Sequence, residues 1–112
     1  KNKQNLFTKQ FWVVNKMNWN LILNELKKGN EIPIIVRGNS MEPTYHNGDL
    51  LHIIQSSSYN VGDIIVLMFS GVQIVHRIIK KDGDYLFCKG DHAKSIQKIK
   101  SSDILGKVTN GS

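Results

Sequence analysis

The first regular pattern along the chain is helical. Apolar residues recur at intervals of three and four positions, at Trp19, Ile22, Leu23 and Leu26. This spacing predicts an amphipathic helix over residues 18–28, with Asn18 as its N-cap and Gly29 as its stop. We expect the helix either to pack on the rest of the protein or to dock a partner or a substrate leader. The apolar run at residues 11–14 is compatible with a strand or an ordered lead-in.

The rest of the chain has the pattern of a β protein. Segments rich in Ile, Val, Leu and Phe predict strands at residues 32–37, 49–55, 63–69, 72–80, 84–89 and 104–109. Residues 70–71 and 81–83 predict hairpin turns, and residues 56–60 and 93–102 predict loops. Short strands with one helix indicate a mostly β fold, a small twisted β-barrel or folded antiparallel sheet with one N-terminal amphipathic helix. We expect a single domain over residues 1–112, with the N-terminal segment and helix at 1–30 and the β core at 31–110.

The charge balance is basic, with a formal net charge of +6 and a pI near 9.6. Such a charge attracts nucleic acid, anionic lipid or acidic peptides without specificity. The loose cluster of Lys89, Lys94, Lys98 and Lys100 is interpreted as a solvated surface. Because the chain has no nucleic-acid reading motif, we expect no specific nucleic-acid partner.

Cysteine and histidine positions exclude several site classes. Cys88 is the only cysteine, so no intrachain disulfide is expected, and no Cys/His spacing suits a structural zinc site. We therefore expect no metal and no cofactor. No hydrophobic run approaches the roughly 18 to 20 residues that span a bilayer. The expected location is cytoplasmic or peripherally membrane-associated.

The turn at residues 38–44, Gly-Asn-Ser-Met-Glu-Pro-Thr, holds the first candidate for chemistry. Gly38 allows backbone angles that other residues avoid, and Pro43 stiffens the turn. Ser40 in such a turn can present its hydroxyl beside main-chain N–H groups, as acyl transfer requires. Further along, His76 lies in a predicted strand and offers a base with a pKa near neutrality. Taken alone, Ser40 fits an ordinary turn serine or helix cap, and His76 fits a half-buried strand histidine.

Four segments in one order resemble the boxes of the type I signal peptidases. Residues 38–51 are similar to the nucleophile box and residues 61–67 to the strand after it. Residues 74–79, Ile-Val-His-Arg-Ile-Ile, are similar to the base box, and residues 89–93, Lys-Gly-Asp-His-Ala, to a box that reads Lys-Gly-Asp-Asn-Asn in many members. The likeness covers most of the chain. The self-cleaving repressor peptidases share the fold and are more distant relatives.

The resemblance is to the serine–histidine branch, found in the endoplasmic reticulum, archaea and sporulation, because the bacterial branch has a lysine in place of His76. It implies Ser40 as nucleophile and His76 as general base. It also implies an oxyanion site at the main-chain N–H of Ser40 with Gly38 or Asn39. In the family, substrate adds as an extended strand beside the segment before the nucleophile, here residues 34–37. The residues expected to line pockets for substrate side chains are Ile34, Val36 and Met41.

The group that orients His76 is left open by the sequence. Asp91 is the first candidate, because the family has an aspartate in that box, and Asp103 or a main-chain oxygen are the alternatives. Serine–histidine members often carry an acidic pair a few residues further on. In this chain the corresponding stretch, residues 94–98, is Lys-Ser-Ile-Gln-Lys and contains no acid.

The predicted function is that of a serine endopeptidase that cleaves a leader or signal-like segment from a precursor. The precursor would bind as an extended strand, and association with a membrane surface or a partner protein is compatible with the charge. The alternative is a catalytically weak or inactive peptide-binding module on the same fold. A third hypothesis, nucleic-acid binding driven by charge, rests on the basic balance alone.

Overall fold

The computed structural model of the chain describes residues 19–109, one helix and seven strands with a short 3-10 turn. The elements are α2 (Trp19–Lys27), β1 (Ile32–Ile35), β2 (Leu50–Ile54), β3 (Ile64–Phe69), β4 (Val72–Asp82), β5 (Tyr85–Lys89), β6 (Ile96–Lys100), η1 (Ser101–Asp103) and β7 (Ile104–Val108). The predicted helix and six predicted strands correspond to elements of this set. The expected strand or lead-in at residues 11–14 and the Asn18 cap lie outside the described residues.

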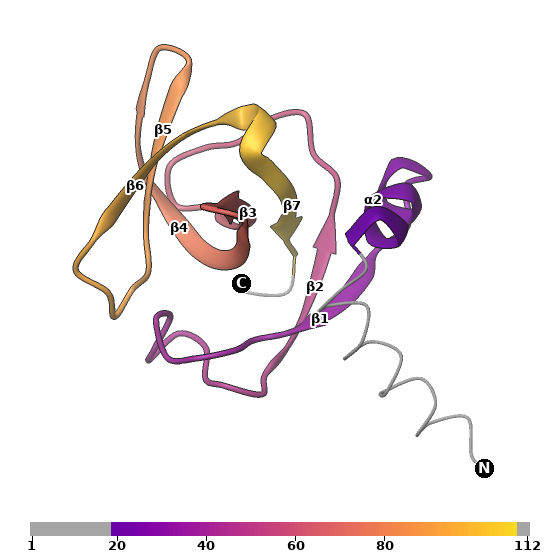
Figure 1. The fold of residues 1–112 in the computed structure, drawn as a ribbon, viewed down its shortest axis with the longest axis horizontal. Coiled ribbons are helices and arrows are strands. Elements are labelled where there is room, and N and C mark those ends of the chain that lie inside the picture. The colour runs from indigo at the N-terminus through magenta and orange to yellow at the C-terminus, as the bar shows by residue number, and fades with distance from the viewer. Residues whose placement is uncertain (1–18, 110–112) are drawn as a thin grey trace.

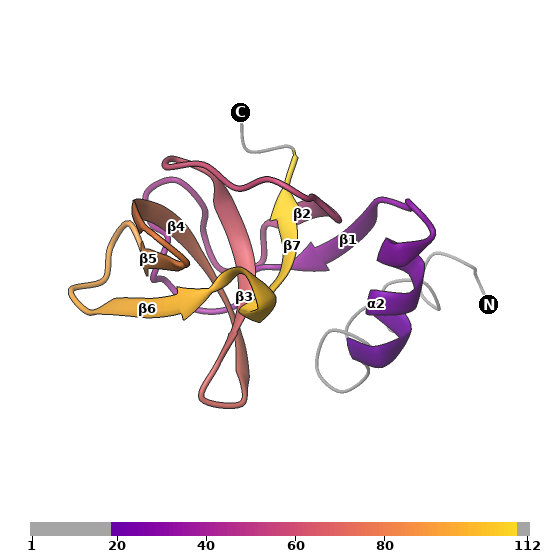
Figure 2. The ribbon, with the colours of Figure 1, turned by 90° about the horizontal axis from the view of Figure 1, so that it is seen from above.

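The strands form one antiparallel sheet in the order β1-β2-β7-β3-β4-β5-β6. The sheet folds over on itself, and its end strands β1 and β6 do not pair with each other, so it is not closed into a barrel. Of the two predicted architectures, the folded antiparallel sheet is confirmed and the barrel is not. Both ribbon views place α2 beyond β1 at one end, while β5 and β6 form the other end (Figure 1, Figure 2).

Strand β6 corrects the prediction of a loop over residues 93–102. Its burial alternates along the strand, because Gln97 and Ile99 are buried while Ile96, Lys98 and Lys100 are exposed. An edge strand with one buried face needs apolar character at only alternate positions. The two buried side chains are enough to hold β6 against β5, where Gln97 pairs with Cys88 and Ile99 with Leu86.

Two apolar clusters hold the folded sheet together. The first packs the buried face of α2, formed by Trp19, Ile22 and Leu26, against β1, β2, β3 and the loop after β1. The second lies among β3, β4, β5 and β6. The helix therefore packs on the sheet, as the first of the two expectations for it states. No helix among residues 19–109 has the length and apolar character needed to cross a membrane.

Candidate active site

Ser40 lies in a loop that the chain fastens at both of its ends. Gly38 has a φ of 84°, in the left-handed region that favours glycine, and its N–H donates to Oδ1 of Asn47 at 2.9 Å. The two ends of the loop are joined by the N–H of Val36, which donates to the main-chain oxygen of Asp49 at 2.9 Å. Ser40 is half-buried at the turn, whereas Gly38 and Asn39 are exposed. The loop thus presents the serine from a constrained backbone.

His76 lies in β4 opposite Ile65 of β3 and is 5% exposed. Because side chains alternate along a strand, the imidazole shares its face with Ile78 of the second apolar cluster and with Ile74, which packs against that cluster. Arg77 points to the other face. The imidazole therefore lies in an apolar setting.

Gly90 lies between the loop that carries Ser40 and the ring of His76. A Cβ added to Gly90 would lie 3.0 Å from Nε2 of His76 and 3.0 Å from Cβ of Ser40. Nε2 of His76 and Cβ of Ser40 therefore lie no more than twice that distance apart. Within residues 19–109 no hydrogen bond joins the side chains of Ser40 and His76. In enzymes, catalytic hydrogen bonds are often long before substrate binds. The N–H of His92 also donates to the main-chain oxygen of Ser40 at 2.7 Å, which links the 90–93 turn to the loop that carries Ser40.

The opposite ring nitrogen of His76 contacts a residue that the sequence did not single out. Nδ1 of His76 lies 2.6 Å from Oε1 of Gln97, which comes from β6 and is 7% exposed. The amide nitrogen of Gln97 donates to Oγ of Ser95 at 3.4 Å. The sequence carries no clear signal for Gln97, because in this strand the apolar Ile96 is exposed and the polar Gln97 is buried.

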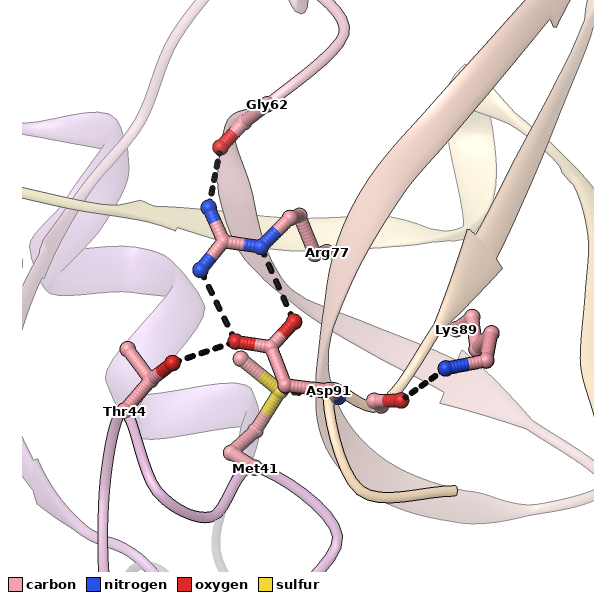
Figure 3. A network of polar contacts seen from close by, with 7 residues as sticks. Met41, Thr44, Gly62, Arg77, Lys89 and Asp91 are labelled. Carbon is pink, nitrogen blue, oxygen red and sulfur yellow. Dashed lines mark hydrogen bonds and ion pairs between the residues drawn. The ribbon is translucent and has the colours of Figure 1, made fainter. Parts of the chain in front are cut away.

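Asp91, the first candidate for the orienting group, is not the hydrogen-bond partner of His76 in the structure. Its carboxylate forms a two-pronged ion pair with Arg77, with Nε and Nη2 each 2.9 Å from an oxygen, and it also accepts from Oγ1 of Thr44 (Figure 3). The cause is strand geometry, because Arg77 lies on the face of β4 opposite to His76. Asp103 is not the hydrogen-bond partner of His76 either, because its carboxylate accepts from the N–H of Lys100 at 3.0 Å.

The hydrogen bonds of Asp91 and Arg77 also reach the loop that carries Ser40. Arg77 also donates to the main-chain oxygen of Gly62, and the N–H of Asp91 donates to Sδ of Met41 (Figure 3). The carboxylate of Asp91 therefore links Arg77 of β4 to Thr44, and its main-chain N–H contacts Met41. Asp91 thus contacts the loop that carries Ser40 rather than the imidazole.

Burial lowers the pKa of His76 below its ordinary value of 6.5. The hydrogen bond with Gln97 and the negative charge of Asp91 oppose this shift, and the positive charge of Lys89 adds to it. Arg77 in turn holds the pKa of Asp91 below its usual range. The arrangement keeps the imidazole neutral near pH 7, and a neutral imidazole is the form that accepts a proton.

A pocket of about 380 Å³ adjoins Ser40. Its wall comes from the segment before the nucleophile on one side and from the start of β4 on the other. It is lined by Trp19, Ile34, Ile35, Val36, Arg37, Ser40, Met41, Val66, Gln73, Ile74 and Val75. The expected lining residues Ile34, Val36 and Met41 are among these, while Gly38 and Asn39 are not. The lining is mostly apolar, which suits an apolar side chain of a peptide.

The described part of the chain offers neither a reactive cysteine nor a metal site. Cys88 is fully buried in β5, and burial raises the pKa of its thiol to about 11, so it holds its proton at neutral pH. Residues 19–109 contain no group of three or more His, Cys, Asp or Glu side chains that could hold a metal ion.

Comparison with known proteins gives a consistent result. The family model of the Peptidase S24-like proteins matches residues 4–109. The catalytic subunit of the signal peptidase complex of Saccharomyces cerevisiae, in strains YJM789 and RM11-1a, is 33% identical over 93 residues, which covers 67% of this chain and 56% of the relative. The chain thus spans about half the length of the curated relatives it matches. It belongs to the Peptidase S24-like family, as a signal-peptidase-like member.

Proposed function

We propose that this chain is a serine endopeptidase that cleaves a leader or signal-like segment from a precursor peptide or protein, with Ser40 as nucleophile and His76 as general base. The observation that supports the proposal is that Ser40 and His76 both lie beside Gly90, next to a pocket of peptide side-chain size. Membership of a peptidase family supports the reaction class.

The proposed reaction begins when Oγ of Ser40 attacks the carbonyl carbon of the scissile bond and its proton passes to Nε2 of His76. The main-chain N–H of Ser40 and the side chain of Asn39 are the proposed donors to the oxyanion that forms. His76 then gives the proton to the leaving amine. Water, deprotonated by His76, hydrolyses the acyl-enzyme and frees Ser40.

The proposed substrate is a chain segment in extended conformation beside residues 34–37. Strand β1 ends the sheet, and the pocket lies between this segment and the start of β4, at Gln73 to Val75. A substrate strand there would place alternate side chains toward Val36, Met41 and the rest of the apolar lining. Because the relative is named as the catalytic subunit of a signal peptidase complex, association with a partner protein is part of the proposal. The net charge of +6 is compatible with association at a membrane surface.

The second candidate is a peptide-binding module with weak or no turnover. Gln97 favours it, because a neutral amide supports a protonated imidazole less than a carboxylate does. The two functions share the peptide groove and differ only in chemistry.

The test is cleavage by the 112-residue chain of precursors co-expressed with it, followed by mass spectrometry of new N-termini. The wild type should generate new N-termini that are absent with Ser40→Ala, while Ser58→Ala, which changes an exposed loop serine, should match the wild type. Equal cleavage by Ser40→Ala would end the peptidase proposal. Binding of the same precursors without cleavage by the wild type would favour the module.

A further inference from the structure

We propose that Gln97 is the positioning residue of His76, and that its neutral amide, in place of a carboxylate, fixes the tautomer that leaves Nε2 able to accept a proton. The inference rests on the proposed roles of Ser40 and His76. It adds Gln97 to the site as a third residue. The hydrogen bond that orients the imidazole then comes from this amide rather than from a charged side chain.

Sheet register explains how a residue on the edge strand reaches the base. Ile78 of β4, Cys88 of β5 and Gln97 of β6 form one cross-strand row, and all three are buried. His76 precedes Ile78 by two positions and therefore lies on the same face. The long side chain of Gln97 spans the intervening strand along this face, and its Oε1 reaches Nδ1 of His76 at 2.6 Å.

Hydrogen-bond chemistry then decides the tautomer. An amide oxygen only accepts hydrogen bonds, so the ring nitrogen beside it must carry the proton. With the proton on Nδ1, the neutral imidazole has its lone pair on Nε2, the ring nitrogen that lies beside Gly90, as Cβ of Ser40 does. Both partners are buried, so water does not compete for the bond.

The charge of the site is distributed differently from that of a triad with a carboxylate. The charged groups that act on His76 are Asp91 and Lys89, with opposite signs, and neither is the hydrogen-bond partner of the ring. Gln97 therefore orients the imidazole without supplying the negative charge that would stabilise its protonated form. A carboxylate in its place would favour the protonated ring strongly at this short distance.

Nitrogen NMR of the imidazole of His76 in the full chain tests the proposal directly. At a pH above its titration, the wild type should show a protonated Nδ1 and an unprotonated Nε2. Gln97→Leu should give a mixture of tautomers or reverse them, and Gln97→Glu should restore the wild-type tautomer and move the titration of His76 to higher pH. Lys98→Leu, on the exposed face of the same strand, should leave the ring signals unchanged.

Kinetics supplies the second readout. Gln97→Leu should lower kcat by at least about tenfold with little change in KM, yet by less than the roughly ten-thousand-fold loss that follows removal of the oriented tautomer in a full triad. Gln97→Glu should recover most of that loss and shift the pH profile upward. If Gln97→Leu is too unstable to measure, Gln97→Glu alone still gives the titration shift.

Two results would overturn the proposal: a wild-type ring with its proton on Nε2, or tautomers and titration that are the same in all three Gln97 forms. The NMR signals do not depend on turnover. Failure of the peptidase proposal, shown by cleavage with Ser40→Ala, is therefore separate from failure of the role of Gln97.

Discussion

Cβ of Ser40 and Nε2 of His76 both lie 3.0 Å from the place that a Cβ on Gly90 would occupy, so the missing side chain of Gly90 leaves space between them. A Cβ on Gly90 would lie 2.5 Å from the main-chain oxygen of Ser40, closer than real Cβ contacts allow, and 3.0 Å from Nε2 of His76. Glycine is needed at this position for space, since its backbone does not lie in the left-handed region as that of Gly38 does.

Gly90→Ala should therefore reduce cleavage at least about a hundredfold, because a shift of the reacting groups by about 1 Å can cost that much. Overpacking should also lower the free energy of unfolding by about 1–3 kcal/mol. Steady-state kinetics and urea unfolding measure the two effects. Gly71→Ala is the control, because it strains a hairpin glycine with open space around it and should keep its activity. Full activity of Gly90→Ala would show that the groups do not meet there.

The pH profile of cleavage should follow the titration of His76. The neutral imidazole is the active form and burial lowers its pKa, so kcat/KM should rise with pH and reach half its maximum below pH 6.5. His76→Ala should remove this limb together with most of the activity, while His46→Gln, at an exposed loop position, should keep it. A profile that is flat from about pH 4 to pH 8 would contradict a histidine base.

Asp91→Asn should destabilise the protein in a pH-dependent way. The folded-state pKa of Asp91 is lowered, chiefly by Arg77, so its ion pair stabilises the fold fully above the ordinary pKa of 3.8 and loses this effect as the pH falls through the folded value. The loss should be about 1–3 kcal/mol at pH 7, since the pair is two-pronged and half-buried. Urea unfolding at pH 7 and near pH 3 measures it, with the exposed Asp84→Asn as control. The variant and the wild type should converge in acid, and a difference independent of pH would contradict this account.

Asp91→Asn should also change the pKa of His76, the proposed base. The carboxylate raises the pKa of His76 across the sheet, so its removal should move the rising limb of the pH profile to lower pH. This shift is opposite in sign to that expected for Gln97→Glu. An unchanged or upward shift would show that the charge of Asp91 does not reach the imidazole.

Filling the pocket should select against large substrate side chains. Ile74 is half-buried in β4 and lines the pocket, whereas Val72 of the same strand is 56% exposed and does not. Ile74→Trp should lower kcat/KM about tenfold or more for peptides with bulky apolar residues and less for those with small ones, because one methylene alone accounts for about 1–3 kcal/mol. Val72→Trp is the matched control. Equal effects of the two variants would place the substrate elsewhere.

Much of the fold could be predicted because its local patterns agree with its tertiary structure. The strand patterns at residues 63–69 and 72–80 contain enough consecutive Ile and Val to be recognised alone, and the 70–71 turn joins them. Strand β6 could not be found this way, because its three exposed positions hold two lysines and only Gln97 and Ile99 are buried. Whether a sheet closes into a barrel depends on strand registers far apart in the chain, which a single sequence does not show.

The candidate site was predictable only in part for a related reason. The sequence indicated Ser40 and His76, and the structure brings them to the same place. The strand alternation that buries His76 places Arg77 on the opposite face, where Arg77 pairs with the carboxylate of Asp91. The partner of the imidazole then comes from the unrecognised strand, as the amide of Gln97. Long-range pairing, rather than residue type, decided which polar group reached the base.

Covalent trapping of the nucleophile tests the central claim most directly. A peptide phosphonate with a small apolar side chain beside its phosphorus should form an ester with Oγ of Ser40, and tandem mass spectrometry of the digested protein locates the modified residue. The account predicts stoichiometric labelling of Ser40 in the wild type, at least about a hundredfold slower labelling in His76→Ala, and none in Ser40→Ala. Labelling of another residue, or equal rates with and without His76, would contradict it.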